Sequence, residues 1–143
     1  MKKVAFLSYF FIVTATLVSC KKVEGEGGAG SITGKIMIDE KLYVNGIYSS
    51  TVSYTGATED VYIVYGGGTD VPNDKVECGY DGTFKFNYLQ PGTYTIYAYN
   101  EVFHTGANAS NNDDDYYTFE PVKMTVELAK KESNDLGTIT LTK

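Results

Sequence analysis

An alternation of apolar and polar residues with a period of two runs through the chain from residue 31 onward and constrains the fold more than any other feature. Ile32, Ile36 and Ile38 alternate with polar or flexible neighbours, as in a strand with one buried face. Further strand-like runs occupy 61–65, 75–78, 83–88, 92–99, 122–128 and 137–141, and Gly, Asn and Asp turns separate them. No segment has a convincing helical period. The pattern predicts seven or more short strands in an all-β sandwich or barrel.

Two turns allow a prediction of strand pairing. Asn45-Gly46 lies between two apolar runs and predicts a tight hairpin, because both residues tolerate the positive φ of a type I′ turn. A three-residue loop ending at Gly82 would place Cys78 opposite Phe84 and align the apolar faces of 75–78 and 83–88. We therefore expect these two segments to form a hairpin.

Composition excludes one class of partner. The chain of 143 residues has the length of a single domain and carries 12 Lys, no Arg, 18 acidic residues and a net charge of -6. An acidic chain without Arg lacks the planar donor that grips phosphate, and its net field repels nucleic acid. We expect no nucleic-acid partner.

The first 19 residues have the features of a secretory signal. Met1-Lys2-Lys3 precedes an apolar run from 4 to 18, which is shorter than a membrane span. Leu17-Val18-Ser19-Cys20 resembles the bacterial lipobox. That resemblance implies a signal peptide over 1–19, a diacylglycerol on the sulfur of Cys20, and acyl chains such as palmitate on its amine. Several chains give a stable anchor, and Lys21 beside the lipid favours the outer membrane.

Residues 20–30 and 31–143 form the two remaining parts of the predicted mature chain. Residues 21–30 hold four glycines and one large apolar residue, Val23, so they are expected to be a flexible tether. The domain itself would span 31–143. With Cys20 lipidated, Cys78 has no partner for a disulfide.

A family resemblance sharpens the expected topology. The segment from Phe84 to Ala98, with Leu89-Gln90-Pro91-Gly92-Thr93-Tyr94 at its centre, resembles carboxypeptidase-regulatory-like, prealbumin-type sandwich domains. The opening 32–36 and the closing 135–141 resemble the same family. The resemblance implies an antiparallel Greek-key sandwich in which Tyr94 has a tyrosine-corner role. It says little about function, because such domains serve many hosts. Residues 41–58 and 103–120 depart from the family pattern and are where a specific function would lie.

Tyrosine is the strongest candidate ligand-binding residue. In the prealbumin family the strands resembling 61–65 and 93–99 are neighbours, so Tyr62, Val64, Tyr97 and Tyr99 would form one outer patch. We expect the hairpin at Asn45-Gly46 to pack on this patch. Tyr62, Tyr97 and Tyr99 are the candidate contacts to a ligand, and the uncovered remainder would be Tyr97 or Tyr99.

Other candidate sites are weaker. Asp113, Asp114 and Asp115 form an acidic run that could supply oxygen ligands to calcium, but an EF-hand reading fails because Asp113 stands where Gly is needed. A solvated loop is the expectation there, with no metal and no cofactor. His104 is interpreted as a solvent-facing loop residue, and Cys78 as a small buried hydrophobe.

The sequence thus predicts an envelope lipoprotein, lipid-anchored at the outer membrane, with a non-catalytic binding, adhesion or scaffolding role toward a protein or glycan. One alternative is a carbohydrate-binding surface lipoprotein that uses exposed Tyr, although the absence of Trp counts against it. A second alternative is a small hydrolase, which would need acid and base groups in a cleft.

Overall fold

A computed structural model describes residues 23–68, 71–104 and 115–143, and all eight of its strands lie between residues 26 and 142. The strands are β1 (Glu26–Val44), β2 (Ile47–Thr55), β3 (Asp60–Tyr65), β4 (Asp74–Glu77), β5 (Thr83–Leu89), β6 (Gly92–His104), β7 (Tyr116–Leu128) and β8 (Ser133–Thr142). The predicted all-β class is confirmed. The part of the chain that the structure describes contains no helix long and apolar enough to cross a membrane.

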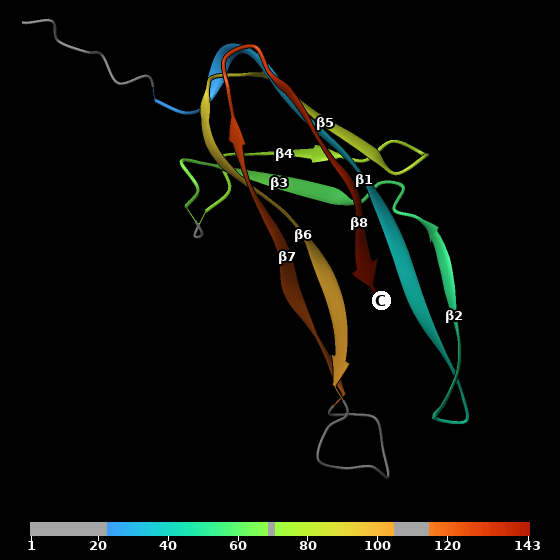
Figure 1. The fold of residues 1–143 in the computed structure, drawn as a ribbon. Coiled ribbons are helices and arrows are strands. Elements are labelled where there is room, and N and C mark those ends of the chain that lie inside the picture. The colour runs from blue at the N-terminus through green and yellow to red at the C-terminus, as the bar shows by residue number, and fades with distance from the viewer. Residues whose placement is uncertain (1–22, 69–70, 105–114) are drawn as a thin grey trace, which may run out of the picture.

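The strands form two packed sheets (Figure 1). In one sheet β1 pairs with β2, β5 and β8, and in the other the order is β4-β3-β6-β7. The predicted sandwich is therefore confirmed, and all pairs are antiparallel except β1 with β8, which is parallel. The core lies between the sheets and is built mainly from alternate residues of their inner faces, among them Ile32, Ile36, Ile38, Val61, Ile63, Phe84, Phe86, Tyr94, Ile96, Ile139 and Leu141. This period-two burial is what the sequence pattern predicted.

The predicted hairpin of 75–78 with 83–88 is wrong. β4 pairs with β3 in one sheet, whereas β5 pairs with β1 in the other, so the chain crosses between sheets at residues 78–83. A tight turn still forms there, because the Gly82 amide donates to the Gly79 carbonyl at 2.8 Å. Cys78 and Phe84 both face the core, as predicted, but they reach it from opposite sheets.

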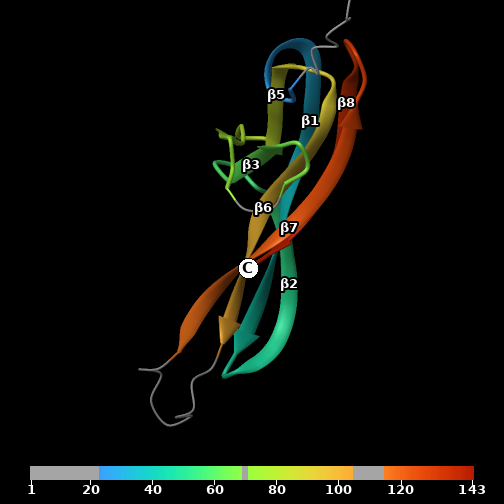
Figure 2. The ribbon, with the colours of Figure 1, turned by 90° about the vertical axis from the view of Figure 1, so that its left-hand side faces the viewer.

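The segment around Asn45-Gly46 forms the predicted tight hairpin but not the predicted cover. Asn45 and Gly46 have φ of 50° and 76°, as a type I′ turn requires. The β1–β2 hairpin extends away from the sandwich rather than folding over it, and Leu42, Val44 and Ile47 remain exposed. Figures 1 and 2 show that this hairpin and the β6–β7 hairpin project from the same end of the molecule.

The predicted tether over 20–30 is wrong for its second half, because β1 already begins at Glu26. The Gln90 amide donates to the Gly25 carbonyl at 2.7 Å, which fixes this segment to the turn between β5 and β6. A Cβ on Gly28 would overlap the backbone of Leu89. The glycines at this point therefore permit close packing between chain segments rather than flexibility.

Tyr94 has the predicted tyrosine-corner geometry. Its side chain is fully buried. The hydroxyl donates to the Gln90 carbonyl at 2.7 Å, and the Gly25 amide donates to the hydroxyl at 3.1 Å. One buried phenol thus joins the β5–β6 turn to the start of β1.

Candidate ligand-binding surface

An aromatic row follows the outer face of the sheet that contains β3, β6 and β7. β3 and β6 pair so that Tyr62 lies opposite Tyr97. β6 and β7 pair so that Glu101 lies opposite Phe119 and Phe103 opposite Tyr117. Residues directly opposite one another in antiparallel strands share a face. The register therefore collects six rings on one face, which we call the aromatic stripe: Tyr62, Tyr97, Tyr99, Phe103, Tyr117 and Phe119.

Neighbouring rings of the stripe are in contact. Tyr62 and Tyr97 stack with centroids 5.1 Å apart and planes 15° apart. Tyr99 meets both of them edge-on, at 5.6 Å and 5.5 Å, and meets Phe119 at 6.5 Å. Further toward the tip, Phe103 and Tyr117 are 5.2 Å apart. These separations lie in the range in which aromatic pairs stabilise one another, so the rings hold one another in place.

Exposure rises along the stripe from the sandwich to the tip of the hairpin. Tyr97 is 5% exposed, whereas Tyr62 and Tyr99 are half-buried. Phe103, Tyr117 and Phe119 are 51%, 60% and 62% exposed. The stripe therefore consists of three largely buried tyrosines on the sandwich and three exposed rings on the β6–β7 hairpin.

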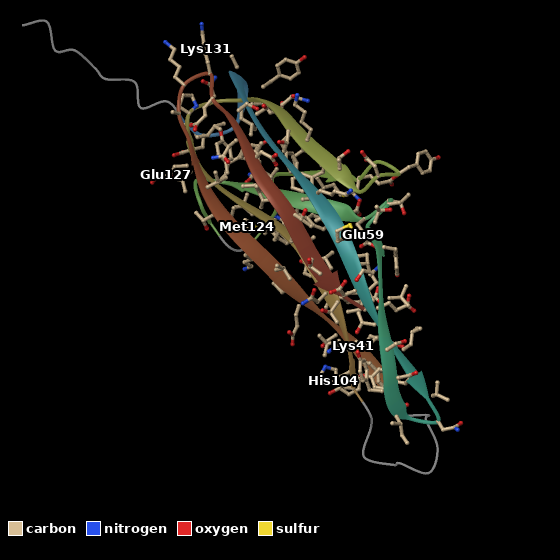
Figure 3. The ribbon with its side chains drawn as sticks, turned by 45° about the vertical axis from the view of Figure 1, so that its right-hand side comes forward. Lys41, Glu59, His104, Met124, Glu127 and Lys131 are labelled. Carbon is tan, nitrogen blue, oxygen red and sulfur yellow. The ribbon has the colours of Figure 1, made fainter. Side chains whose placement is uncertain are left out.

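An open pocket of about 690 Å³ lies beside the stripe where β3 begins. Tyr62, Tyr99 and Phe119 line it together with polar residues, namely Thr58, Glu59, Asp60, Glu101 and Lys143. The strands β3 and β6 pair only from Tyr62 to Tyr65 on β3. The part of β6 that follows Tyr97 therefore has no partner on β3. This offset between a short strand and a long one produces the hollow. Figure 3 places Glu59 part-way between Lys131 at one end of the molecule and His104 near the other.

The polar side of the pocket is a small ion cluster. The Nζ atom of Lys143 lies 2.6 Å from Oε1 of Glu59 and 3.6 Å from Oε1 of Glu101. Nearby, Lys75 contacts Asp60 at 2.6 Å, and the Tyr62 hydroxyl donates to Asp60 at 3.4 Å. Three carboxylates thus face two ammonium groups, which leaves the cluster acidic. Carboxylate oxygens here are acceptors for hydroxyl or ammonium donors.

The pKa shifts follow these contacts. Burial lowers the pKa of Lys143, but the hydrogen bond to Glu59 and the charges of Glu59 and Glu101 outweigh it and raise the pKa overall. Burial raises the pKa of Tyr97 to about 12, with the hydrogen bond to Tyr99 acting in the same direction. Burial, followed by the charge of Asp60, also raises the pKa of Tyr62. Lys143 is therefore charged and these phenols neutral at physiological pH.

The predicted outer patch forms, but its exposed part differs from the prediction. Tyr62, Tyr97 and Tyr99 do come together, and Val64 on the same strand as Tyr62 is 5% exposed. Of the two residues expected to stay uncovered, Tyr97 is enclosed between Tyr62 and Tyr99, and Tyr99 is half-buried.

Phe103, Tyr117 and Phe119 are not among the candidates that the sequence indicates, because residues 103–120 depart from the family pattern. Phe103 ends a period-two series that starts at Tyr97 on β6, and Tyr117 and Phe119 form another on β7. That continued alternation was the signal that could have found them.

The other predicted site residues lie elsewhere. Asp113 and Asp114 are outside the described residues, and among those described no group of three His, Cys, Asp or Glu could hold a metal ion. Asp115 is described and directly precedes β7. His104 ends β6 rather than lying in a loop; it stacks on Tyr116 at 4.8 Å, and its Nε2 atom lies 2.8 Å from Oγ1 of Thr118.

Cys78 is buried, as predicted. Its side chain is 3% exposed and packs in the core. Burial raises the pKa of its thiol to about 11, and the nearby carboxylates, Glu59 first, act in the same direction. The thiolate that nucleophilic chemistry needs is therefore disfavoured.

Comparison with known proteins does not show a family for this chain. No protein-family model matches the chain, and no curated protein matches it. A crystal structure from Pseudomonas aeruginosa, described as a "putative carbohydrate binding protein", aligns with a TM-score of 0.48 and 14% identity, covering 84% of this chain and 92% of its own. At this level of similarity nothing about ligand or function follows for the present chain.

Proposed function

We propose that this protein is a non-catalytic binding module that holds a glycan on the aromatic stripe. The observation that carries the proposal is the junction of an exposed aromatic row with a pocket whose rim is carboxylate-rich. Rigid rings offer large apolar faces for the CH-rich faces of a sugar. The carboxylates of the rim can accept hydrogen bonds from its hydroxyls. Exposed aromatic patches on monomers mark interaction sites more often than scattered apolar residues do.

The charge of the rim narrows the ligand class. Glu59, Asp60 and Glu101 outnumber the two lysines that contact them. An anionic sugar would meet net repulsion from this cluster, whereas a neutral sugar would meet hydrogen-bonding groups without that repulsion. The stripe runs from Tyr97 to Phe103 along β6, about 20 Å at the usual rise per residue. This length favours an extended, neutral glycan chain over a single sugar.

A non-catalytic role agrees with where the reactive residues lie. His104 and Cys78 are not among the residues that line the pocket. The small-hydrolase alternative would need one carboxyl group as a proton donor and a second as a base or nucleophile, whereas all three carboxylates of the lining are held in ion pairs with Lys143 or Lys75.

The proposal includes an envelope location through a lipid on Cys20. Cys20→Ala should abolish fatty-acid labelling in cells and leave the leader unprocessed, because the thiol is the lipid acceptor. Labelling of the variant equal to that of the wild-type chain would contradict the anchor.

Binding is tested with residues 21–143, which contain every described strand and the whole core. Affinity electrophoresis against soluble neutral polysaccharides (laminarin, glucomannan and xylan) should show retardation of the wild-type chain by at least one. Tyr99→Ala and Phe119→Ala should each weaken it at least tenfold, while Tyr80→Ala should not. Tyr80 is the matched control, since it is 93% exposed and lies outside the pocket. Equal retardation of all three variants, or no retardation of the wild type, would overturn the proposal.

A further inference from the structure

The strand β2 has a free edge and belongs to the sheet that does not carry the aromatic stripe. β2 is the end strand of its sheet, and its described neighbour is β1 alone. Eight of its nine residues are exposed, and the ninth, Thr55, is half-buried. Figure 1 shows β2 as the outermost strand on its side of the molecule. Its outer backbone groups are therefore accessible to another strand.

The composition of β2 is unusual for an exposed edge. Its sequence, IYSSTVSYT, has no charged residue and no proline. Natural proteins usually place charges, proline or bulges on such edges to prevent pairing with other chains. The edge strands of the other sheet follow this rule: β4 carries Asp74, Lys75 and Glu77, and β7 carries Glu120 and Pro121. Within the same molecule, β2 stands out as the edge strand without a charged residue or a proline.

One bulge limits where a partner could pair. The register of β1 with β2 shifts between Leu42 and Tyr43, so that Ser49 has no direct partner on β1. Residues 50–55 of β2 follow without a further shift. The regular part of the edge is thus six residues long, close to the usual length of a strand.

This regular segment is complementary to itself. An antiparallel pair with a two-fold axis through Val52 would set Val52 opposite Val52, Thr51 opposite Ser53 and Ser50 opposite Tyr54. No like charges would meet, and the two side chains of each facing pair would project from the same face of the joined sheet. A two-fold contact between identical chains requires this kind of self-complementary surface.

We propose that two copies of this chain associate through their β2 edges, antiparallel about Val52, to form one sheet that continues across both molecules. The pairing satisfies the free backbone groups of the uncharged edge and brings apolar side chains such as Val52 and Tyr54 together across it. It leaves the aromatic stripe open, because the stripe lies on the other sheet.

Sedimentation velocity of residues 21–143 over a range of concentrations tests the proposal. The wild-type chain should show a concentration-dependent dimer. Val52→Lys and Val52→Glu should each be monomeric at concentrations at least tenfold higher, since each places two like charges at the axis. An equal mixture of the two variants should restore the dimer, because Lys then faces Glu. Val52 is 45% exposed, so both side chains fit the monomer. Val52 lies opposite Glu40 on β1, so Val52→Glu should melt at a slightly lower temperature than Val52→Lys, and a single cooperative melt of each variant confirms folding.

Thr138→Lys is the matched control: it adds the same charge at an exposed position of β8, on another strand of the same sheet, and should leave the dimer intact. A wild-type chain that stays monomeric throughout would overturn the proposal. So would a Val52→Lys variant that dimerises like the wild type, or a mixture of the charged variants that remains monomeric.

Discussion

At the scale of single residues, Tyr94 shows how one side chain can hold three chain segments together. Its ring is fully buried in the core, and its hydroxyl bonds both Gln90 and Gly25. Tyr94→Phe should lower the free energy of unfolding by about 1–3 kcal/mol, because it leaves buried backbone groups without a partner. Tyr94→Ala should cost about 3–5 kcal/mol through the added cavity. Urea unfolding measures both, and equal stability of Tyr94→Phe and the wild type would contradict this role.

Cys78 gives a second residue-scale prediction, through pH. Its pKa in the folded protein is about 11, above an ordinary value near 9.0, because burial disfavours the thiolate. The folded state therefore holds the proton more tightly than the unfolded state. The stability from this group is complete below pH 9 and is lost as the pH rises through 11. Urea melts between pH 8 and 11 should show a steeper loss of stability in the wild-type chain than in Cys78→Ala; parallel loss would contradict the shift.

At the scale of elements, the start of β1 depends on glycine for close contact. A Cβ on Gly28 would overlap the Leu89 backbone, which cannot move without disturbing the β5–β6 turn. Gly28→Ala should therefore destabilise the fold by about 1–3 kcal/mol, as overpacking does. Gly68→Ala is the control, since its nearest neighbour is the side chain of Val64 at 3.3 Å. Equal thermal stability of the two variants would restore the tether interpretation of this segment.

Elements also show what sequence can and cannot predict. Strand positions, the Asn45-Gly46 turn and the burial of Tyr94 follow from local patterns, since period and turn chemistry are properties of a few neighbouring residues. The partner of β4 could not be predicted, because the apolar face of 75–78 fits either sheet equally well. The β1–β2 hairpin was predicted, but its projection away from the sandwich was not. Apolar residues such as Leu42 and Ile47 usually indicate burial, and the sequence alone does not show that they stay exposed.

The candidate surface also has a part that could be predicted from the sequence and a part that could not. Pairing of β3 with β6 brought Tyr62, Tyr97 and Tyr99 together, as the family resemblance implied. The pocket beside them depends on Lys143 reaching Glu59, 84 residues away in sequence. Such a contact is set by the pairing of β8 with β1, which continues to the backbone bond from the Lys143 amide to the Asp39 carbonyl, and no local pattern in the chain encodes it.

At the scale of the whole molecule, the position of a lipid anchor would determine which end of the protein points away from the membrane. The start of β1, at the blue end of the described chain, lies at the end of the sandwich opposite the two projecting hairpins (Figure 1). Two residues lie between Cys20 and Val23, the first described residue, so these two positions are at most about 10 Å apart. β1 alone would extend up to about 60 Å. A lipid on Cys20 would therefore point both hairpins, and the open end of the aromatic stripe, away from the bilayer.

Fluorescence quenching on vesicles tests this orientation. A fluorophore on Lys130→Cys, in the turn before β8, should be quenched by lipids with spin-labelled headgroups when the protein is anchored. The same fluorophore on Ile47→Cys, at the hairpin tip, should not be, because β1 separates it from the surface. Ile47 is 72% exposed and Lys130 is exposed, so both label without disturbing the core, while Cys78 is buried and does not compete. Equal quenching at the two positions would show that the molecule lies flat on the membrane.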